Sequence, residues 1–151
     1  MGNVLIAFKL LEDGESIPVG SKKIPYHIIF DVKHDLTRKA RLVAGGYQTR
    51  DLPPHLTYSS VVSRESVQIV FLLAALNNLN ILSGDIGNAY LNAPCAEKVH
   101  VTVGPELFGT SNQGKTAVIV RALYGLKSAS SSWRSHLCNT IVDVLGYKAS
   151  K

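Results

Sequence analysis

The stretch SGDIGNAYLNAP, residues 83–94, holds the residues of this sequence best placed to do chemistry. Asp85 follows an apolar run and precedes a glycine, an amide and the aromatic Tyr90. Small neighbours on both sides leave room for a ligand to approach the backbone. Two interpretations stay open. Asp85 caps a short helix over 88–92, which is the common use of Asp at such a junction, or it is an oxygen ligand for a hard cation such as Mg²⁺.

Metal-assisted phosphoryl transfer needs more than one carboxylate, because two ions about 3.5–4 Å apart have to be held together. The sequence contains no Asp-Asp pair. Among the other acids, Glu97 and Glu106 border predicted loops, and Asp143 falls on the polar side of the last predicted helix. We therefore expect Asp85 to have no second carboxylate within bridging distance.

Composition sets few limits on function. A chain of 151 residues with ordinary apolar content fits a single domain, and a net charge of +5 permits a polyanionic partner without requiring one. Cys95 and Cys138 lie far apart and share no metal-ligand spacing with the scattered histidines. This pattern argues against a zinc site or a disulfide framework and favours a reducing, intracellular compartment.

No targeting or membrane segment is predicted. The first residues lack the basic start of a signal peptide, and Ile6 stands where a myristoylation signal has Ser or Thr. The longest apolar run, Val67–Leu76, is too short to span a bilayer and indicates a buried helix. We therefore expect no membrane partner.

Two predicted strands form a hairpin upstream of Asp85. Residues 23–35 and 38–47 are rich in β-branched and aromatic side chains, and a turn near HDLT separates them. The hairpin has a basic edge, which consists of Lys33, His34, Arg38, Lys39 and Arg41.

The helix predicted over 64–79 begins at the N-cap Ser63, and its later turns are apolar all round, so we expect burial on nearly all sides. A second helix follows the serine run 128–132 and ends at Gly146. Further strands are predicted over 80–85, 97–103 and 116–123, with a short helix or turn at 88–92. The order of these elements predicts an α+β fold in which a small, mostly antiparallel sheet packs against helices. We expect this sheet to contain both the strand that ends at Asp85 and the strand that includes residues 118–120.

Four blocks of the sequence together resemble the reverse transcriptase of copia-type retrotransposons, closest to the branch seen in algae and oomycetes. The blocks are HIIFDVKHDLTRKARLVAGGYQT (27–49), TYSSVVSRESVQIVFLLAALNNLNIL (57–82), GDIGNAYLNAPCAEKV (84–99) and AVIVRALYGLKSASSSWRSHL (117–137). They keep the family's order and cover most of the chain. The resemblance implies the fingers and an incomplete palm of a right-hand RNA-directed DNA polymerase from a retrotransposon Pol polyprotein.

The resemblance also implies roles for single residues. In the family motif D-[IV]-x-x-A-[FY]-L-N, Asp85 matches the first catalytic carboxylate and a ligand of Mg²⁺, and Ile86 offers its backbone carbonyl to the same ion. Tyr90 matches the aromatic that excludes a ribose 2′-hydroxyl. Arg41 matches the fingers arginine over the nucleotide triphosphate, and Lys39 is a further candidate for that contact.

Other residues take nucleotide and template-primer roles by the same resemblance. Tyr124 and Gly125 in LYGLKSASSSW match the nucleotide side of the palm. Lys127 in that block, together with Lys33 and Arg38 in the hairpin, is a candidate for contacts to the template or primer backbone. The implied partners are an RNA or DNA template-primer, deoxynucleoside triphosphates and the rest of the Pol polyprotein.

The sequence departs from the family pattern in three places. Gly87 replaces a larger polar residue, and Ser130 and Ser131 stand where Pro-Arg or Gly-Ala is common. The family's Y-x-D-D hairpin, which supplies the other catalytic carboxylates, is not found in residues 1–151. We therefore expect residues 1–151 to be the N-terminal portion of the polymerase domain, truncated before that hairpin and inactive alone. The expected location is a cytoplasmic virus-like particle or the nucleus. The alternative is a non-catalytic nucleic-acid-binding remnant of a decayed element.

Overall fold

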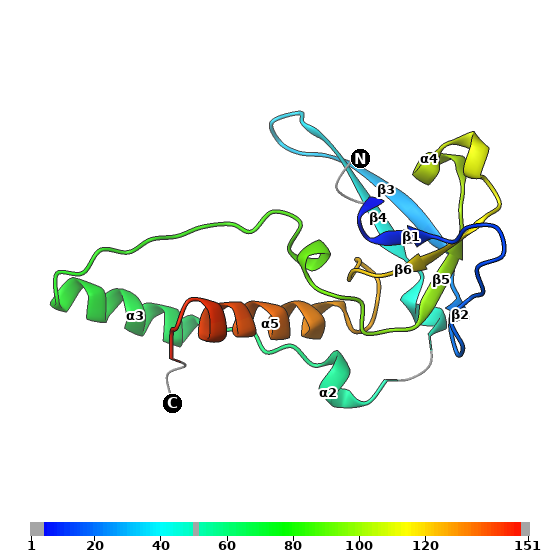
Figure 1. The fold of residues 1–151 in the computed structure, drawn as a ribbon. Coiled ribbons are helices and arrows are strands. Elements are labelled where there is room, and N and C mark those ends of the chain that lie inside the picture. The colour runs from blue at the N-terminus through cyan, green and yellow to red at the C-terminus, as the bar shows by residue number, and fades with distance from the viewer. Residues whose placement is uncertain (1–4, 50–51, 149–151) are drawn as a thin grey trace.

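The computed structural model describes residues 5–49 and 52–148 and has the α+β character that the sequence predicts. Its main sheet contains the strands β1 (Phe8–Leu10), β2 (Lys22–Lys23), β5 (Val99–Thr102) and β6 (Thr116–Ile119). Their order is β1-β6-β5-β2 (Figure 1). β1, β6 and β5 are antiparallel, as predicted, but β2 joins β5 in parallel. A long connection separates β2 from β5, so the two strands need not form a tight hairpin.

β3 (Tyr26–Val32) and β4 (Arg38–Ala44) form a separate antiparallel hairpin, which confirms the sequence prediction. Side chains alternate between its two faces. The core face carries Tyr26, Ile28, Phe30, Val32, Arg38, Ala40, Leu42 and Ala44. The basic face carries His27, Ile29, Asp31, Lys39, Arg41 and Val43. The two faces therefore present different chemistry to the rest of the molecule.

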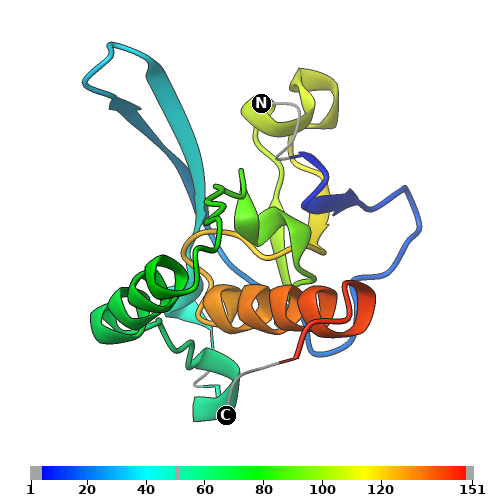
Figure 2. The same ribbon diagram turned by 90° about the vertical axis from the view of Figure 1, so that its left-hand side faces the viewer.

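Only the base of the hairpin is packed. Leu42 and Ala44 are buried, whereas Phe30 is 76% exposed and Val32 is 59% exposed. Figures 1 and 2 show the hairpin projecting from the main sheet. The hydrophobic contacts at its base fix its direction, and its tip reaches into solvent.

The hydrophobic core lies between the main sheet, the hairpin base and the helix α5 (Ala129–Asn139). A π-helical turn, Thr140–Val144, extends α5, and Gly146 with φ +71° ends it as predicted. Trp133 of α5 packs against the core, whereas Val144, near the end of the helical segment, is exposed. The short helices are η1 (Gly46–Gln48), α2 (Pro54–Thr57), η2 (Ala89–Asn92), α4 (Pro105–Phe108) and η3 (Thr110–Asn112).

The long helix α3 (Arg64–Leu76) begins as predicted, because the hydroxyl of Ser63 accepts a hydrogen bond from the Ser66 N–H at 3.1 Å. The prediction that it is buried on nearly all sides is wrong. Ala74 is its only buried residue, and Phe71 is 53% exposed. Figure 1 shows α3 projecting away from the main sheet, and no described helix or strand covers its apolar surface. Apolar composition favours burial but does not supply the surface that buries it.

The prediction of a strand over 80–85 is also wrong. These residues are extended but pair with no described strand, and Leu82 is 98% exposed. A β-strand exists only where a neighbour completes its hydrogen bonds, which local residue preference cannot provide. The predicted sheet joining this segment to β6 therefore does not form, since β6 lies between β1 and β5. None of the helices among the described residues is long and apolar enough to cross a bilayer.

Candidate functional site

A cleft of about 450 Å³ lies between the basic face of the hairpin, the segment that contains Asp85, and the segment after β6. The residues lining it are Lys39, Arg41, Leu42, Asp85, Ile86, Gly87, Asn88, Ala89, Tyr90, Leu91, Ala122, Leu123 and Tyr124. Within the part of the chain that the structure describes, Asp85 is the only acidic side chain of this lining, and Lys39 and Arg41 are its only cationic ones. The cleft thus combines one carboxylate, two cations and two tyrosine rings.

Asp85 lies in the extended segment before η2 and is exposed to solvent. It does not cap that helix. The N-cap is Asn88, whose backbone is left-handed at φ +52°, and it makes no side-chain capping bond. No described residue donates a hydrogen bond to Asp85. The first interpretation of Asp85, a helix cap, is therefore wrong, and its oxygens remain available to a ligand in the cleft.

Among the residues that the structure describes, no carboxylate other than that of Asp85 lines the cleft. Glu97 is buried beside Ser128, Glu106 accepts a hydrogen bond from the Tyr26 hydroxyl, and neither residue lines the cleft. Among the described residues, no group of three or more His, Cys, Asp and Glu side chains could hold a metal ion. The donor set around Asp85 fits a weakly held Mg²⁺ that keeps most of its waters.

Tyr90 is held from two directions. Its ring meets the ring of Tyr124 edge to face, with centroids 4.8 Å apart and an interplanar angle of 60°. Its hydroxyl and the hydroxyl of Ser130 share a hydrogen bond of 3.0 Å. The ring is half-buried and lines the cleft. Edge-to-face packing and a fixed hydroxyl leave little freedom for the side chain.

The hairpin supplies the cations of the cleft. Lys39 and Arg41 share the basic face, and the Arg41 guanidinium donates to Asp31 at 3.3 Å across the hairpin. Arg38 lies on the opposite face of the same strand, and Lys33 lies in the exposed turn at the tip. The predicted basic edge is therefore divided, with Lys39 and Arg41 at the cleft and the other two cations away from it.

Gly125 ties the segment after β6 to the hairpin. The Ala44 N–H donates to the Tyr124 carbonyl at 2.7 Å. A Cβ at Gly125, where φ is +89°, would lie 2.0 Å from the Ala44 carbonyl oxygen. A Cβ at Gly46 would lie 2.1 Å from the Gly125 oxygen. Only glycine allows the two backbones to approach this closely. Gly125 thus supports the cleft through its backbone without lining it.

Lys127 is outside the cleft. Its ammonium donates to the Thr49 carbonyl at 3.3 Å, which links the start of α5 to the segment after η1. The structure therefore brings together Asp85, Ile86, Arg41, Lys39, Tyr90 and Tyr124, and it places Gly125, Lys33, Arg38 and Lys127 elsewhere.

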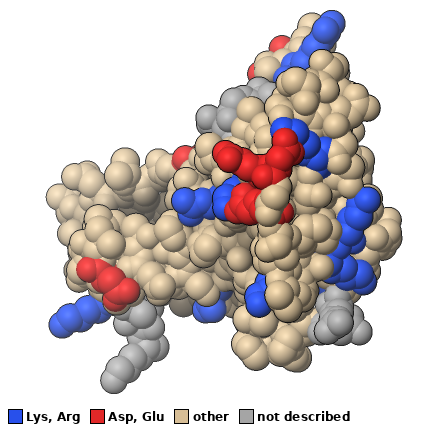
Figure 3. All heavy atoms as spheres, turned by 45° about the vertical axis from the view of Figure 1, so that its right-hand side comes forward, with Lys and Arg blue, Asp and Glu red and all other residues tan. Residues whose placement is uncertain are grey.

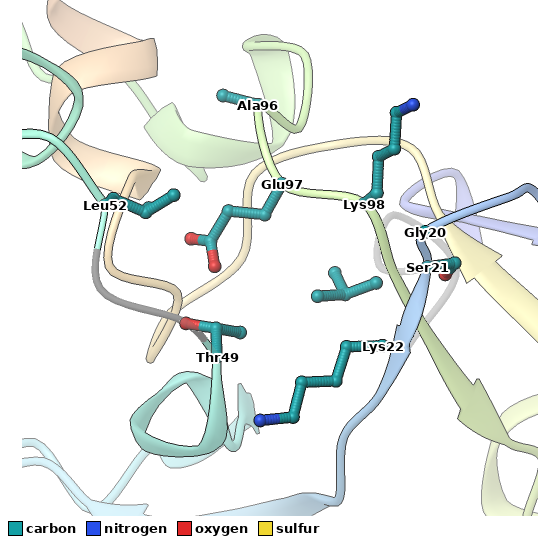
Figure 4. Close-up of a pocket in the computed structure, with 9 residues that line it drawn as sticks. Gly20, Ser21, Lys22, Thr49, Leu52, Ala96, Glu97 and Lys98 are labelled. Carbon is teal, nitrogen blue, oxygen red and sulfur yellow. The ribbon is translucent and has the colours of Figure 1, made fainter.

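A second cavity, of about 520 Å³, is lined in part by Glu97, whose burial sequence reasoning did not predict. Glu97 is 7% exposed, and its Oε1 accepts hydrogen bonds from the Ser128 N–H at 2.9 Å and the Ser128 hydroxyl at 2.8 Å. Figure 4 shows its carboxylate directed between Leu52 and Thr49, and Lys98 pointing away. Ser128 is the N-cap of α5, so Glu97 anchors the start of that helix.

Charge alone does not mark a binding face. Figure 3 shows Lys and Arg side chains in separate groups around an acidic patch on the face in view. Sequence reasoning did not assign contacts to Asp31, Glu97 or Ser130, whose partners lie 10, 31 and 40 positions away in the chain. Nothing in their local sequence indicates these partners.

Comparison with known proteins identifies the family. The model of the family described as "Reverse transcriptase (RNA-dependent DNA polymerase)" matches residues 13–151. The chain is 32% identical over 107 residues to the retrovirus-related Pol polyprotein from transposon RE1 of Arabidopsis thaliana, a match covering 70% of this chain and 7% of that protein. It is 31% identical over 123 residues to the transposon Ty1-BL Gag-Pol polyprotein of Saccharomyces cerevisiae, covering 78% of this chain and 7% of that protein.

The chain therefore spans only about 7% of the length of these curated relatives. No solved structure matches it. The family match extends over nearly all of the chain, and the relatives are Pol polyproteins of transposons. On these findings, the chain belongs to the reverse transcriptase family, in its copia-type branch.

Proposed function

We propose that this chain forms part of the fingers and palm of an RNA-directed DNA polymerase that adds deoxynucleotides to a primer 3′-hydroxyl. The observation that carries the proposal is the cleft, to which residues 85–91 contribute Asp85 and Tyr90 and the hairpin contributes Arg41. A carboxylate for a metal ion, an aromatic for the sugar and a cation for the phosphates are the groups that transfer from a nucleoside triphosphate requires.

Asp85 is the proposed first ligand of Mg²⁺, with the carbonyl of Ile86 beside it. Its exposed oxygens are engaged by no described residue, which supports this role. When bound, the ion would neutralise triphosphate charge and favour attack by the primer oxygen. Two ions need further acids, so we propose that other carboxylates join Asp85 from elsewhere in the polyprotein.

Arg41 and Lys39 are the proposed triphosphate ligands. Both lie on the face of the hairpin that lines the cleft. A planar guanidinium donates two parallel hydrogen bonds to phosphate oxygens, and a lysine adds a mobile point charge. Tyr90 is the proposed barrier to a ribose 2′-hydroxyl, with Tyr124 supporting its ring and Gly125 setting the position of Tyr124.

Lys33, Arg38 and Lys127 are the proposed template-primer contacts. All three lie outside the cleft, which supports contacts to a nucleic-acid strand rather than to the incoming nucleotide. Contacts to backbone phosphates release counterions, so binding should weaken steeply as salt rises.

The uncovered surfaces support the proposal that residues 1–151 are the N-terminal portion of a polymerase domain. Most of the apolar side chains of helix α3 are exposed, and the segment 80–85 pairs with no described strand. We propose that other parts of the palm cover them. We also propose that the source element is nearest to those of algae and oomycetes. Two free cysteines support a cytoplasmic particle or the nucleus as the proposed location.

Primer extension tests the proposal. We expect the isolated chain to fail to extend a primer on an RNA template with Mg²⁺ and deoxynucleotides, because it offers one carboxylate. Joined to a copia-type polymerase segment that carries Y-x-D-D, it should extend the primer. Asp85→Asn should then abolish synthesis, while the matched control Asp143→Asn, at an exposed acid outside the cleft, should not.

The outcomes separate the two functions under consideration. Synthesis that persists with Asp85→Asn would refute the role of Asp85. Salt-sensitive RNA binding without synthesis by the joined protein would favour the alternative, a non-catalytic nucleic-acid-binding remnant.

A further inference from the structure

Ser130 is the second residue of α5 and makes one side-chain contact that reaches the cleft. Its hydroxyl shares the 3.0 Å hydrogen bond with the hydroxyl of Tyr90, forty positions earlier in the chain. Helix α5 packs against η2, the short helix that carries Tyr90, so the two residues belong to elements held together by packing. The bond therefore joins the end of the Tyr90 side chain to a rigid support.

The two restraints on Tyr90 act at different points of its ring. Tyr124 meets the ring itself at 4.8 Å between centroids, and Ser130 holds the hydroxyl at the far end. A tyrosine side chain has only two rotatable bonds that move the ring, so one packed neighbour and one fixed end are enough to define both. Without Ser130, the ring would be restrained only by packing, against Tyr124 and the hydrophobic core, and its hydroxyl end would be free of a hydrogen bond to the described residues.

We propose that Ser130 is a positioning residue that sets the selectivity of the cleft for deoxyribonucleoside over ribonucleoside triphosphates by holding Tyr90 in place. The inference rests on the proposed role of Tyr90. A side chain excludes a hydroxyl group by steric overlap only if it does not move aside, so the strength of exclusion depends on what restrains the ring.

The test compares the binding of dATP and ATP, each with Mg²⁺, to the 151-residue chain by titration calorimetry. The measured quantity is the ratio of the two dissociation constants, ATP over dATP. Ser130→Ala should lower this ratio by about two- to tenfold, the range expected for loss of one neutral hydrogen bond. Ser130→Thr, which keeps the hydroxyl, should restore it.

Two controls separate positioning from a general effect on α5. Ser132→Ala removes the hydroxyl of a half-buried serine two positions on, which has no side-chain partner among the described residues, and should leave the ratio unchanged. Tyr90→Phe removes the same hydrogen bond from its other end without altering α5. It should lower the ratio as Ser130→Ala does, and the double variant should show no additional loss.

The outcomes distinguish this inference from the function beneath it. A wild-type chain that prefers dATP, with the preference unchanged in Ser130→Ala, would overturn the role of Ser130 and leave that of Tyr90 intact. A wild-type chain that binds neither nucleotide, or both equally, would overturn the proposed role of Tyr90 and this inference with it. Equal losses in Ser130→Ala and Ser132→Ala would assign the effect to α5 and refute the specific contact.

Discussion

Gly125→Ala tests whether the hairpin and the segment after β6 form one unit that shapes the cleft. An alanine at φ +89° costs about 1–2 kcal/mol relative to glycine. Its Cβ would also lie 2.0 Å from the Ala44 oxygen and 2.8 Å from a methyl of Val43, so the backbones must separate. Separation weakens the 2.7 Å bond from Ala44 to Tyr124, at a further cost of about 1–2 kcal/mol.

The expected loss in the free energy of unfolding is therefore about 2–4 kcal/mol. Urea denaturation followed by circular dichroism measures it, with the slope of the transition compared between variants. Gly114→Ala is the matched control. Gly114 has φ +86°, but a Cβ added there would meet no atom within 4 Å, so this variant should lose only about 1–2 kcal/mol.

Binding of a magnesium-bound deoxynucleotide provides the second readout. Gly125→Ala should weaken it, because Tyr124 and Arg41 approach the cleft from the two backbones that separate, whereas Gly114→Ala should not. Equal losses of stability in the two variants, with binding unchanged in both, would refute the argument that close backbone contact shapes the cleft.

Three further predictions concern single side chains. Asp31→Asn should tighten triphosphate binding up to about fivefold at low salt, because Arg41 loses a competing carboxylate, and Asp35→Asn should not; calorimetry would compare them. Glu97→Ala should lower the free energy of unfolding by about 1–3 kcal/mol, because the buried donors of the α5 N-cap lose their acceptor. Glu97→Gln retains an acceptor and should lose less, and urea denaturation would compare the two variants. Burial, with a hydrogen bond to a glutamate, raises the pKa of Tyr26 to about 12. The stability that the neutral tyrosine contributes below pH 10 should therefore be lost as the pH rises towards 12. In Tyr26→Phe, the free energy of unfolding should fall less steeply over this pH range.

Elements with local causes were predictable from the sequence. The hairpin follows from its β-branched strands and polar turn, and α3 begins at the serine that caps it. The end of α5 at Gly146 follows from the left-handed conformation that glycine allows. Each signal lies within a few residues of the feature that it specifies.

The errors concern features that depend on a partner. The segment 80–85 has the residue types of a strand but no neighbour to pair with, and α3 has the composition of a buried helix but no cover among the described residues. At the site, the family resemblance nominated Arg41 and Tyr90, and the structure places both at one cleft. Their contacts to Asp31 and Ser130 arise from the tertiary fold and leave no trace in local spacing.

The hairpin anchored at its base has a mechanical consequence. Seven residues of β3, at about 3.3 Å each, make an arm of roughly 20 Å. Close backbone contacts at Gly46 and Gly125 hold the base of the hairpin, and its tip is exposed to solvent. A tilt of about 10° at this fulcrum would carry the tip roughly 4 Å, and Arg41, at the middle of β4, about half that distance. The arm thus amplifies motion outward, so the two cations of the cleft would move with it, Lys39 farther than Arg41.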